Sequence, residues 1–228
     1  MDLLNALVAF GNFVFVPAVA YGSQLALGAL AVTLIYGILR FSNFAHGDTM
    51  ALGTMVTIIA TWGLQSLGIS LGPLPTALLA IPVGIAFTAV LVLGTDRLVY
   101  RFYRKQKVAP VIMVIVSIGV MFIYNGLTRL VLGPDDQNFA DGERFLISAR
   151  DFKAMTGLSE GLAIRTTQVL TVVTAILVVA ALFWFLNRTR TGKSMRAYSD
   201  NEDLALLSGI DPERVVRVTW IIVAALAT

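Results

Sequence analysis

Cysteine is absent from the 228 residues, and histidine occurs once, at position 46. The chain therefore forms no disulfide bond, and it offers neither a thiolate nor a multi-histidine metal site. Charge is also scarce. Asp, Glu, Lys and Arg make up 14% of the residues, whereas a soluble domain has about a quarter, and hydrophobic residues reach 57%.

Charged residues are missing altogether from four long stretches, 3–39, 49–95, 108–128 and 166–187. A helix needs about 20 apolar residues to cross the hydrocarbon core of a bilayer, so each stretch is long enough for one crossing. The stretch 49–95 is long enough for two. Buried helices of soluble proteins rarely reach such lengths. The composition therefore predicts an all-α, polytopic transmembrane helix bundle, forming a single domain over residues 1–228.

The apolar runs divide into about six predicted membrane spans, separated by polar loops or by turns rich in Gly and Pro. Residues 1–16 contain Gly11 and Asn12 and are followed by Pro17, so they are expected to form a separate short helix at the membrane interface. The spans that follow are predicted at about 18–39, 49–67, 76–98, 109–131 and 166–187, with a sixth run after residue 214.

The positions of Lys and Arg predict how the bundle is oriented. Five basic residues lie in the loop 97–107 and four in the stretch 188–196. Two spans separate these loops, so both must lie on one face, and their charge places that face in the cytoplasm. The loop 133–165 and the amino terminus are then outside. This loop contains the acidic residues Asp135, Asp136, Asp141, Glu143, Asp151 and Glu160.

The loop 188–214 is predicted to contain a short helix. Ser199-Asp200-Asn201-Glu202 has the form of a capping box, which predicts a helix from about 200 to 208. Gly209 stands where a left-handed residue ends a helix, and Asp211-Pro212 then has the pattern of a cap followed by a first helical residue.

One face of this short helix would carry Leu204, Leu207 and Ser208, with Ala205 beside them. Two interpretations are open. The helix either lies on lipid or its own bundle, as amphipathic interfacial helices do, or fits into a groove on a soluble partner.

Two parts of the chain resemble a known family of transporters. The run from Asp203 to Gly209 resembles the EAA loop of bacterial ABC importer permeases: an acidic residue, any residue, Ala, three residues and Gly. The run Thr191–Ala197, followed by Leu204-Ala205 and Gly209-Ile210, is similar to the branched-chain amino-acid permease family in particular. Two further segments, Leu34–Arg40 and Asn43–Gly47, resemble the amino-terminal signature of the same family.

This resemblance implies a permease subunit in the inner (plasma) membrane of a bacterium, with the loops 97–107 and 188–214 in the cytoplasm. It implies transport of branched-chain or related amino acids by alternating access, driven by separate ATPase subunits that bind the ATP. The expected partners are these ATPases, a second permease subunit, an external substrate-binding protein and membrane lipid. No cofactor, metal or catalytic residue is expected on this chain. The implied ATPase-coupling residues are Asp203, Leu204, Ala205, Leu206, Gly209 and Ile210.

Two features depart from the family pattern. Asp203 stands where the family usually has Glu, which preserves the charge. Family members continue through further membrane helices after the coupling loop, whereas this sequence stops at Thr228 inside an apolar run. The sequence is therefore expected to be incomplete at its carboxyl-terminal end.

A polar segment, residues 40–48, interrupts the apolar runs and contains Asn43, His46 and Asp48. It is either a tight cytoplasmic turn, as Arg40 would suit, or a broken helix whose free backbone groups line the translocation pathway. Asn43, His46 and Asp48 are the candidate pathway residues, because polar groups at membrane depth are costly and tend to be functional.

Other classes of protein fit less well. A channel or an ion-coupled secondary transporter is the main alternative, but its spans would usually carry paired ionisable residues. A simple membrane anchor would not need a capped, glycine-terminated loop helix. Gly192-Lys193-Ser194 lacks the first glycine of a phosphate-binding loop, since Asn187 stands there. The basic and aromatic run 101–107 suits a membrane boundary, so no nucleic-acid partner is expected.

Overall fold

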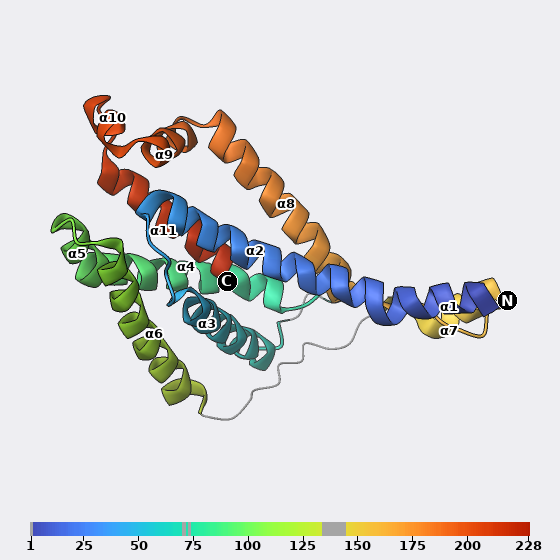
Figure 1. The fold of residues 1–228 in the computed structure, drawn as a ribbon. Coiled ribbons are helices and arrows are strands. Elements are labelled where there is room, and N and C mark those ends of the chain that lie inside the picture. The colour runs from blue at the N-terminus through green and yellow to red at the C-terminus, as the bar shows by residue number, and fades with distance from the viewer. Residues whose placement is uncertain (1, 70–71, 73, 134–144) are drawn as a thin grey trace.

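The computed structural model is a bundle of helices with one small sheet, and it describes residues 2–69, 72, 74–133 and 145–228 (Figure 1). The helices, in chain order, are α1 (Asp2–Phe10), the π-helical η1 (Gly11–Phe15), α2 (Val16–Leu39), α3 (His46–Ser66), α4 (Ala77–Thr95), the π-helical η2 (Asp96–Tyr100), α5 (Arg101–Lys105), α6 (Pro110–Leu132), α7 (Ala149–Thr156), α8 (Thr166–Arg188), α9 (Arg190–Asp200), α10 (Glu202–Leu207) and α11 (Pro212–Ala227). Strands β1 (Phe145–Ile147) and β2 (Ile164–Arg165) pair antiparallel. The predicted all-α polytopic bundle is confirmed, although these two short strands were not expected.

Four helices in the described part of the chain are long and apolar enough to cross a membrane: Leu3–Leu39, Ala77–Lys105, Pro110–Leu132 and Thr166–Arg188. They coincide with four of the six predicted spans. The other two predicted spans are also helical, as α3 and α11, but neither is both long enough and apolar enough to be counted with these four. α3 carries several Thr and Gly residues, and α11 is 16 residues long.

The predicted break between an interfacial helix at 1–16 and a first span was wrong. α1, η1 and α2 form one continuous helix, in which Pro17 lies at the start of α2. Proline lacks an N–H and its ring clashes with the preceding turn, and a π-type turn can absorb such a disturbance. Here the Val16 N–H bonds to the carbonyl of Gly11, so the helix widens before Pro17 and does not stop.

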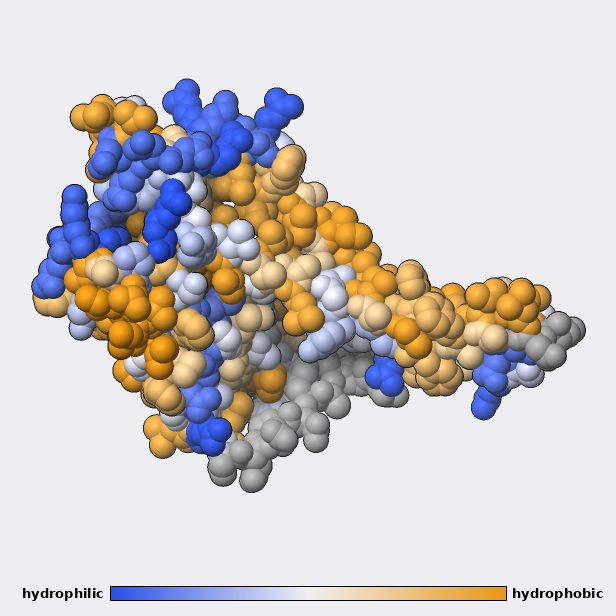
Figure 2. All heavy atoms as spheres, viewed as in Figure 1, coloured by the Kyte–Doolittle hydropathy of each residue, from blue (hydrophilic) through white to orange (hydrophobic). Residues whose placement is uncertain are grey.

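Polar contacts hold the beginning of this long helix beside the segment that follows α7. The side-chain oxygen of Asn12 accepts a 2.9 Å hydrogen bond from the Ala163 N–H, and that of Asn5 accepts one of 3.4 Å from the Glu160 N–H. In Figures 1 and 2 this part projects from the bundle as an apolar arm. At 1.5 Å per residue the 37-residue helix is about 55 Å long, which exceeds a hydrocarbon core of about 30 Å.

The opposite end of the bundle is formed by α5, α9 and α10, and we call it the basic end. Figure 2 shows hydrophilic residues gathered there. Glu213, at the start of α11, pairs with Arg101 at 3.3 Å and with Arg104 at 3.8 Å. These ion pairs confirm the prediction that the loops 97–107 and 188–214 share one face. The loop 133–165 was predicted to lie on the other face, and four of its acidic residues, Asp135, Asp136, Asp141 and Glu143, lie outside the described residues.

The centre of the bundle depends on a close crossing of α3 and α4, with α11 packed against both. A Cβ atom at Gly84 would lie 2.0 Å from the Thr57 hydroxyl oxygen, and one at Gly53 would lie 2.6 Å from the Thr88 hydroxyl oxygen. Small residues allow helix backbones to approach closely in lipid. The threonine hydroxyls bond back to carbonyls of their own helices, so α3 tolerates its polar residues by burying them.

Candidate functional site: a short helix at the basic end

The corner between α8 and α9 is built around Gly192. The hydroxyl of Thr189 accepts a hydrogen bond of 3.0 Å from the Gly192 N–H and caps α9. A Cβ atom at Gly192 would lie 2.3 Å from the Phe185 carbonyl oxygen, so a larger residue would collide with the end of α8. Gly192-Lys193-Ser194 is therefore a helix corner, in agreement with the rejection of a phosphate-binding loop.

α9 is attached to the carboxyl-terminal end of α2. The Ser199 hydroxyl donates a 2.9 Å hydrogen bond to the Gly37 carbonyl, and the Arg40 guanidinium donates to the Ser199 carbonyl. Met195 and Tyr198 are buried on the same side of α9 and pack against Ile38. A displacement of α9 would therefore pull on α2.

The predicted capping box was wrong by two residues. α9 continues to Asp200, and Asn201 is the true cap of α10, with its side-chain oxygen accepting a 3.0 Å hydrogen bond from the Leu204 N–H. Ser199 cannot cap α10, because its hydroxyl is bound to α2. Glu202 accepts a 2.8 Å hydrogen bond from the Tyr198 hydroxyl and does not reach back to Ser199. Burial of the Tyr198 hydroxyl raises its pKa, and the hydrogen bond to Glu202 raises the pKa further.

The predicted end of α10 is confirmed. Gly209 has a φ of +78°, and its N–H bonds to the Leu206 carbonyl at 3.0 Å. The Ile210 N–H then reaches the Ala205 carbonyl at 3.1 Å. Asp211 caps α11 by accepting from the Glu213 N–H at 2.9 Å, as its position before Pro212 predicts.

The six predicted coupling residues lie in two groups. Ala205 is 3% exposed, and Ile210 packs against the same buried cluster as Met195 and Tyr198, so these two residues hold α10 in place. Leu204 and Leu206 are exposed, as are Asp203 and Gly209. Leu207, which was left out of the predicted set, is 85% exposed and is the most prominent apolar side chain of α10.

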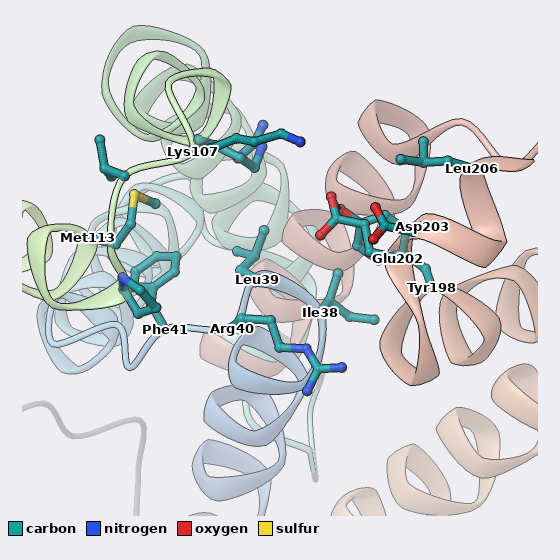
Figure 3. A pocket seen from close by; sticks show the side chains of 13 residues that line it. Ile38, Leu39, Arg40, Phe41, Lys107, Met113, Tyr198, Glu202, Asp203 and Leu206 are labelled. Carbon is teal, nitrogen blue, oxygen red and sulfur yellow. Dashed lines mark hydrogen bonds between the residues drawn. The ribbon is translucent and has the colours of Figure 1, made fainter.

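A pocket of about 340 Å³ lies between α10, the end of α2 and the turn from α5 to α6 (Figure 3). Both apolar and charged side chains line it. The apolar and aromatic ones are Ile38, Leu39, Phe41, Val108, Pro110, Met113, Tyr198 and Leu206, and the charged ones are Arg40, Arg104, Lys107, Glu202 and Asp203. Asp203 thus faces this pocket as well as belonging to the predicted coupling set.

The segment 40–48 joins α2 to α3 and contains a turn in which the His46 N–H bonds to the Asn43 carbonyl at 3.3 Å. Arg40 ends α2 in a left-handed conformation, with a φ of 58°, and the chain then runs down the inside of the bundle. The Phe44 N–H donates to the Ser117 hydroxyl at 3.1 Å, and Asp48 accepts from the Asn125 side chain at 3.1 Å. Asn125 lies about 22 Å along α6 from Pro110, so α3 begins well within the bundle.

The three predicted pathway residues have different surroundings. Asn43 is buried, and its side-chain oxygen accepts from the Tyr100 hydroxyl and from the Ala45 N–H, each at 3.1 Å. His46 is 4% exposed, and neither ring nitrogen forms a hydrogen bond within the described residues. Asp48 is partly exposed. Their assignment to a pathway stays a prediction.

A family model described as "Branched-chain amino acid transport system / permease component" matches residues 15–228. The chain belongs to this permease family. The match includes α2 to α11, and therefore both the polar segment and the short helix α10. Its family and its apolar helices make the chain a multi-pass protein of the inner membrane.

Curated relatives of the permease carry the same description. It is 28% identical over 218 residues to the high-affinity branched-chain amino acid transport system permease protein LivH of Salmonella typhimurium, covering 92% of this chain and 65% of that one. It is 29% identical over 218 residues to LivH of Escherichia coli K12, with the same coverage. It is 29% identical over 224 residues to BraD of Pseudomonas aeruginosa, covering 93% and 66%. The permease therefore spans slightly less than two thirds of the length of these relatives. No solved structure matches it.

Proposed function

We propose that this chain is the permease subunit of an ABC importer that carries branched-chain or related amino acids across the inner membrane. A separate cytoplasmic ATPase supplies the energy by docking on α10. A second permease subunit and an external substrate-binding protein complete the transporter. The substrate class is that of the similar permeases LivH and BraD, and the coupling role rests on the geometry of α10.

The exposed apolar face of α10 is the observation that carries this proposal. Leu204 is 61% exposed and Leu207 is 85% exposed, on a helix whose two ends are fixed by Asn201 and Gly209. An apolar patch on a rigid, exposed element favours a protein partner over solvent. The helix lies at the basic end, which the distribution of Lys and Arg places in the cytoplasm, where ATP is available.

The contacts of α9 and α10 provide a route for force. Ala205 and Ile210 attach α10 to the cluster that contains Val215 of α11, and Ser199 attaches α9 to α2. α11 packs against α2, α3 and α4 in the centre of the bundle. A movement of α10 with its ATPase would therefore reach the helices that enclose the core, which is the requirement for alternating access.

The test is co-purification of an ABC ATPase with the detergent-solubilised chain, identified by mass spectrometry and by ATP hydrolysis. Leu207→Asp should remove the ATPase, because a carboxylate would have to be desolvated in the docking groove. Met155→Asp is the matched control, since Met155 is also 85% exposed but lies on α7, away from the basic end. Retention of the ATPase by Leu207→Asp would contradict the proposed docking.

A further inference from the structure

The pocket beneath α10 presents charges of both signs around an apolar surface. Lys107 comes from the turn between α5 and α6, whereas Glu202 and Asp203 come from α10 (Figure 3). Phe41 and Met113 line the side of the pocket away from Glu202 and Asp203, and Leu39 and Ile38 lie between the two sides (Figure 3). The charges on its two sides thus come from elements far apart in the sequence, one of which is the predicted coupling helix.

Most of the charged groups at this pocket already have partners. Arg104 pairs with Asp96 at 2.7 Å, the Arg40 guanidinium binds the Ser199 carbonyl, and Glu202 accepts from Tyr198. Lys107 and Asp203 differ, since neither side chain has a hydrogen-bond or ion-pair partner among the residues that the structure describes.

Unpaired charges on an open surface are ordinary and are simply solvated. Lys107 and Asp203 are distinguished by the concave, partly apolar space that they share. The volume of about 340 Å³ is at the lower end of the range for small-molecule sites, which is about 300–1,000 Å³. One cation, one anion and an apolar wall match a small zwitterion with an apolar side chain.

We propose that this pocket binds a free amino acid with an apolar side chain from the cytoplasm. The Lys107 ammonium holds the α-carboxylate, the Asp203 carboxylate holds the α-ammonium, and Leu39 and Ile38, in the middle of the pocket, contact the side chain. The choice of an amino acid as ligand rests on the proposed function, whereas the charge pattern is a property of the pocket itself.

Such a ligand would regulate the transporter. A bound amino acid joins α10 to the turn between α5 and α6 and stabilises the arrangement in which those elements lie at this distance. A ligand shifts a conformational equilibrium toward the state that it binds more tightly. The transported product, once it accumulates in the cytoplasm, would therefore restrain the coupling helix and lower ATP hydrolysis.

The first test measures binding of radiolabelled leucine to the detergent-solubilised chain. Lys107→Gln should weaken binding at least tenfold, and Lys107→Arg should restore most of it. Lys105→Gln is the matched control, because Lys105 is an exposed lysine at the end of α5, two positions before Lys107, and does not line the pocket. Unlabelled 4-methylpentanoate and 3-methylbutylamine, which each lack one charge of leucine, should compete at least tenfold more weakly than leucine.

The second test uses the transporter with its ATPases in proteoliposomes, with leucine added only on the side that contains ATP. Leucine should lower stimulated ATP hydrolysis in the wild type and in Lys105→Gln but not in Lys107→Gln.

Equal leucine binding by the wild type and Lys107→Gln, or no leucine binding by the wild type, would overturn the pocket assignment. A rate of stimulated ATP hydrolysis that does not change when this leucine is added would overturn the regulatory role. A wild-type complex without any stimulated hydrolysis would instead contradict the proposed importer function, and the binding result would still decide the pocket.

Discussion

The Ser199 hydroxyl donates a 2.9 Å hydrogen bond to the backbone carbonyl of Gly37. This bond joins α9, which precedes the short helix α10, to the last turn of the long first helix. The Arg40 guanidinium reinforces the junction by binding the carbonyl of the same serine. The junction connects the exposed helix at the basic end to a helix of the transmembrane bundle.

Ser199→Ala should weaken the coupling between ATP hydrolysis and transport. The substitution leaves the Gly37 carbonyl without its side-chain donor, and the expected loss of folding stability is only about 1 kcal/mol. Transport per ATP hydrolysed should fall, whereas the amount of protein in the membrane should not. Ser194→Ala is the control, because the Ser194 hydroxyl donates to the Arg190 carbonyl within its own helix. Equal coupling in the two variants would show that the junction transmits nothing.

Gly209→Val should abolish stimulation of the ATPase while leaving membrane insertion intact. Among the described residues, no neighbouring atom lies within 4 Å of a Cβ at Gly209, so the effect comes from its φ of +78° and not from a collision. A β-branched residue is disfavoured there by about 1–2 kcal/mol, which would change the end of α10. Gly209→Asn should retain most of the stimulation, because Asn tolerates the left-handed conformation. Full stimulation in the valine variant would contradict the role of this helix end.

Gly84→Ala should destabilise the bundle by about 1–3 kcal/mol, since the new methyl group has to displace Thr57 and Thr228 at the crossing of α3 and α4. Thermal unfolding in detergent would show this as a lower Tm. Gly94→Ala, on the same helix, brings its new Cβ within 4 Å of no atom in the described part of the chain and should be neutral or slightly stabilising. A similar Tm for both variants would mean that the close crossing is not required.

The sequence predicted the features that local chemistry determines. The uncharged stretches located four of the spans, because a charged side chain is costly in the hydrocarbon core whichever neighbours its helix has. Gly209 and Asp211 indicated helix ends correctly, since the left-handed conformation and the side-chain cap depend on a few neighbouring residues.

The errors occurred where distant contacts decide the structure. Ser199 has the composition of a cap, but its hydroxyl is bound to Gly37 in a helix far away in the sequence. Pro17 indicates a break, but a π-type turn lets the long helix continue. Ala205 was placed beside Leu204 on one face, whereas the structure buries it against α11 and α9.

The pocket at the basic end could not be predicted from local patterns. Lys107 looked like one member of a basic loop, and Asp203 looked like a coupling residue. Only the packing of α10 near the turn between α5 and α6 brings them to one space. Leu207 was predicted on one face of the helix with Leu204 and Ser208 but is not among the predicted coupling residues, and its 85% exposure is a property of the folded helix.

The central claim is that α10 lies on the cytoplasmic side and faces a partner there. The absence of native cysteine allows a direct test, since Leu207→Cys introduces a single thiol at an exposed position. A membrane-impermeant maleimide should label this thiol in inside-out vesicles but not in intact cells, and bound ATPase should protect it. Met155→Cys should show the opposite sidedness. Labelling of Leu207→Cys from outside intact cells would contradict the account.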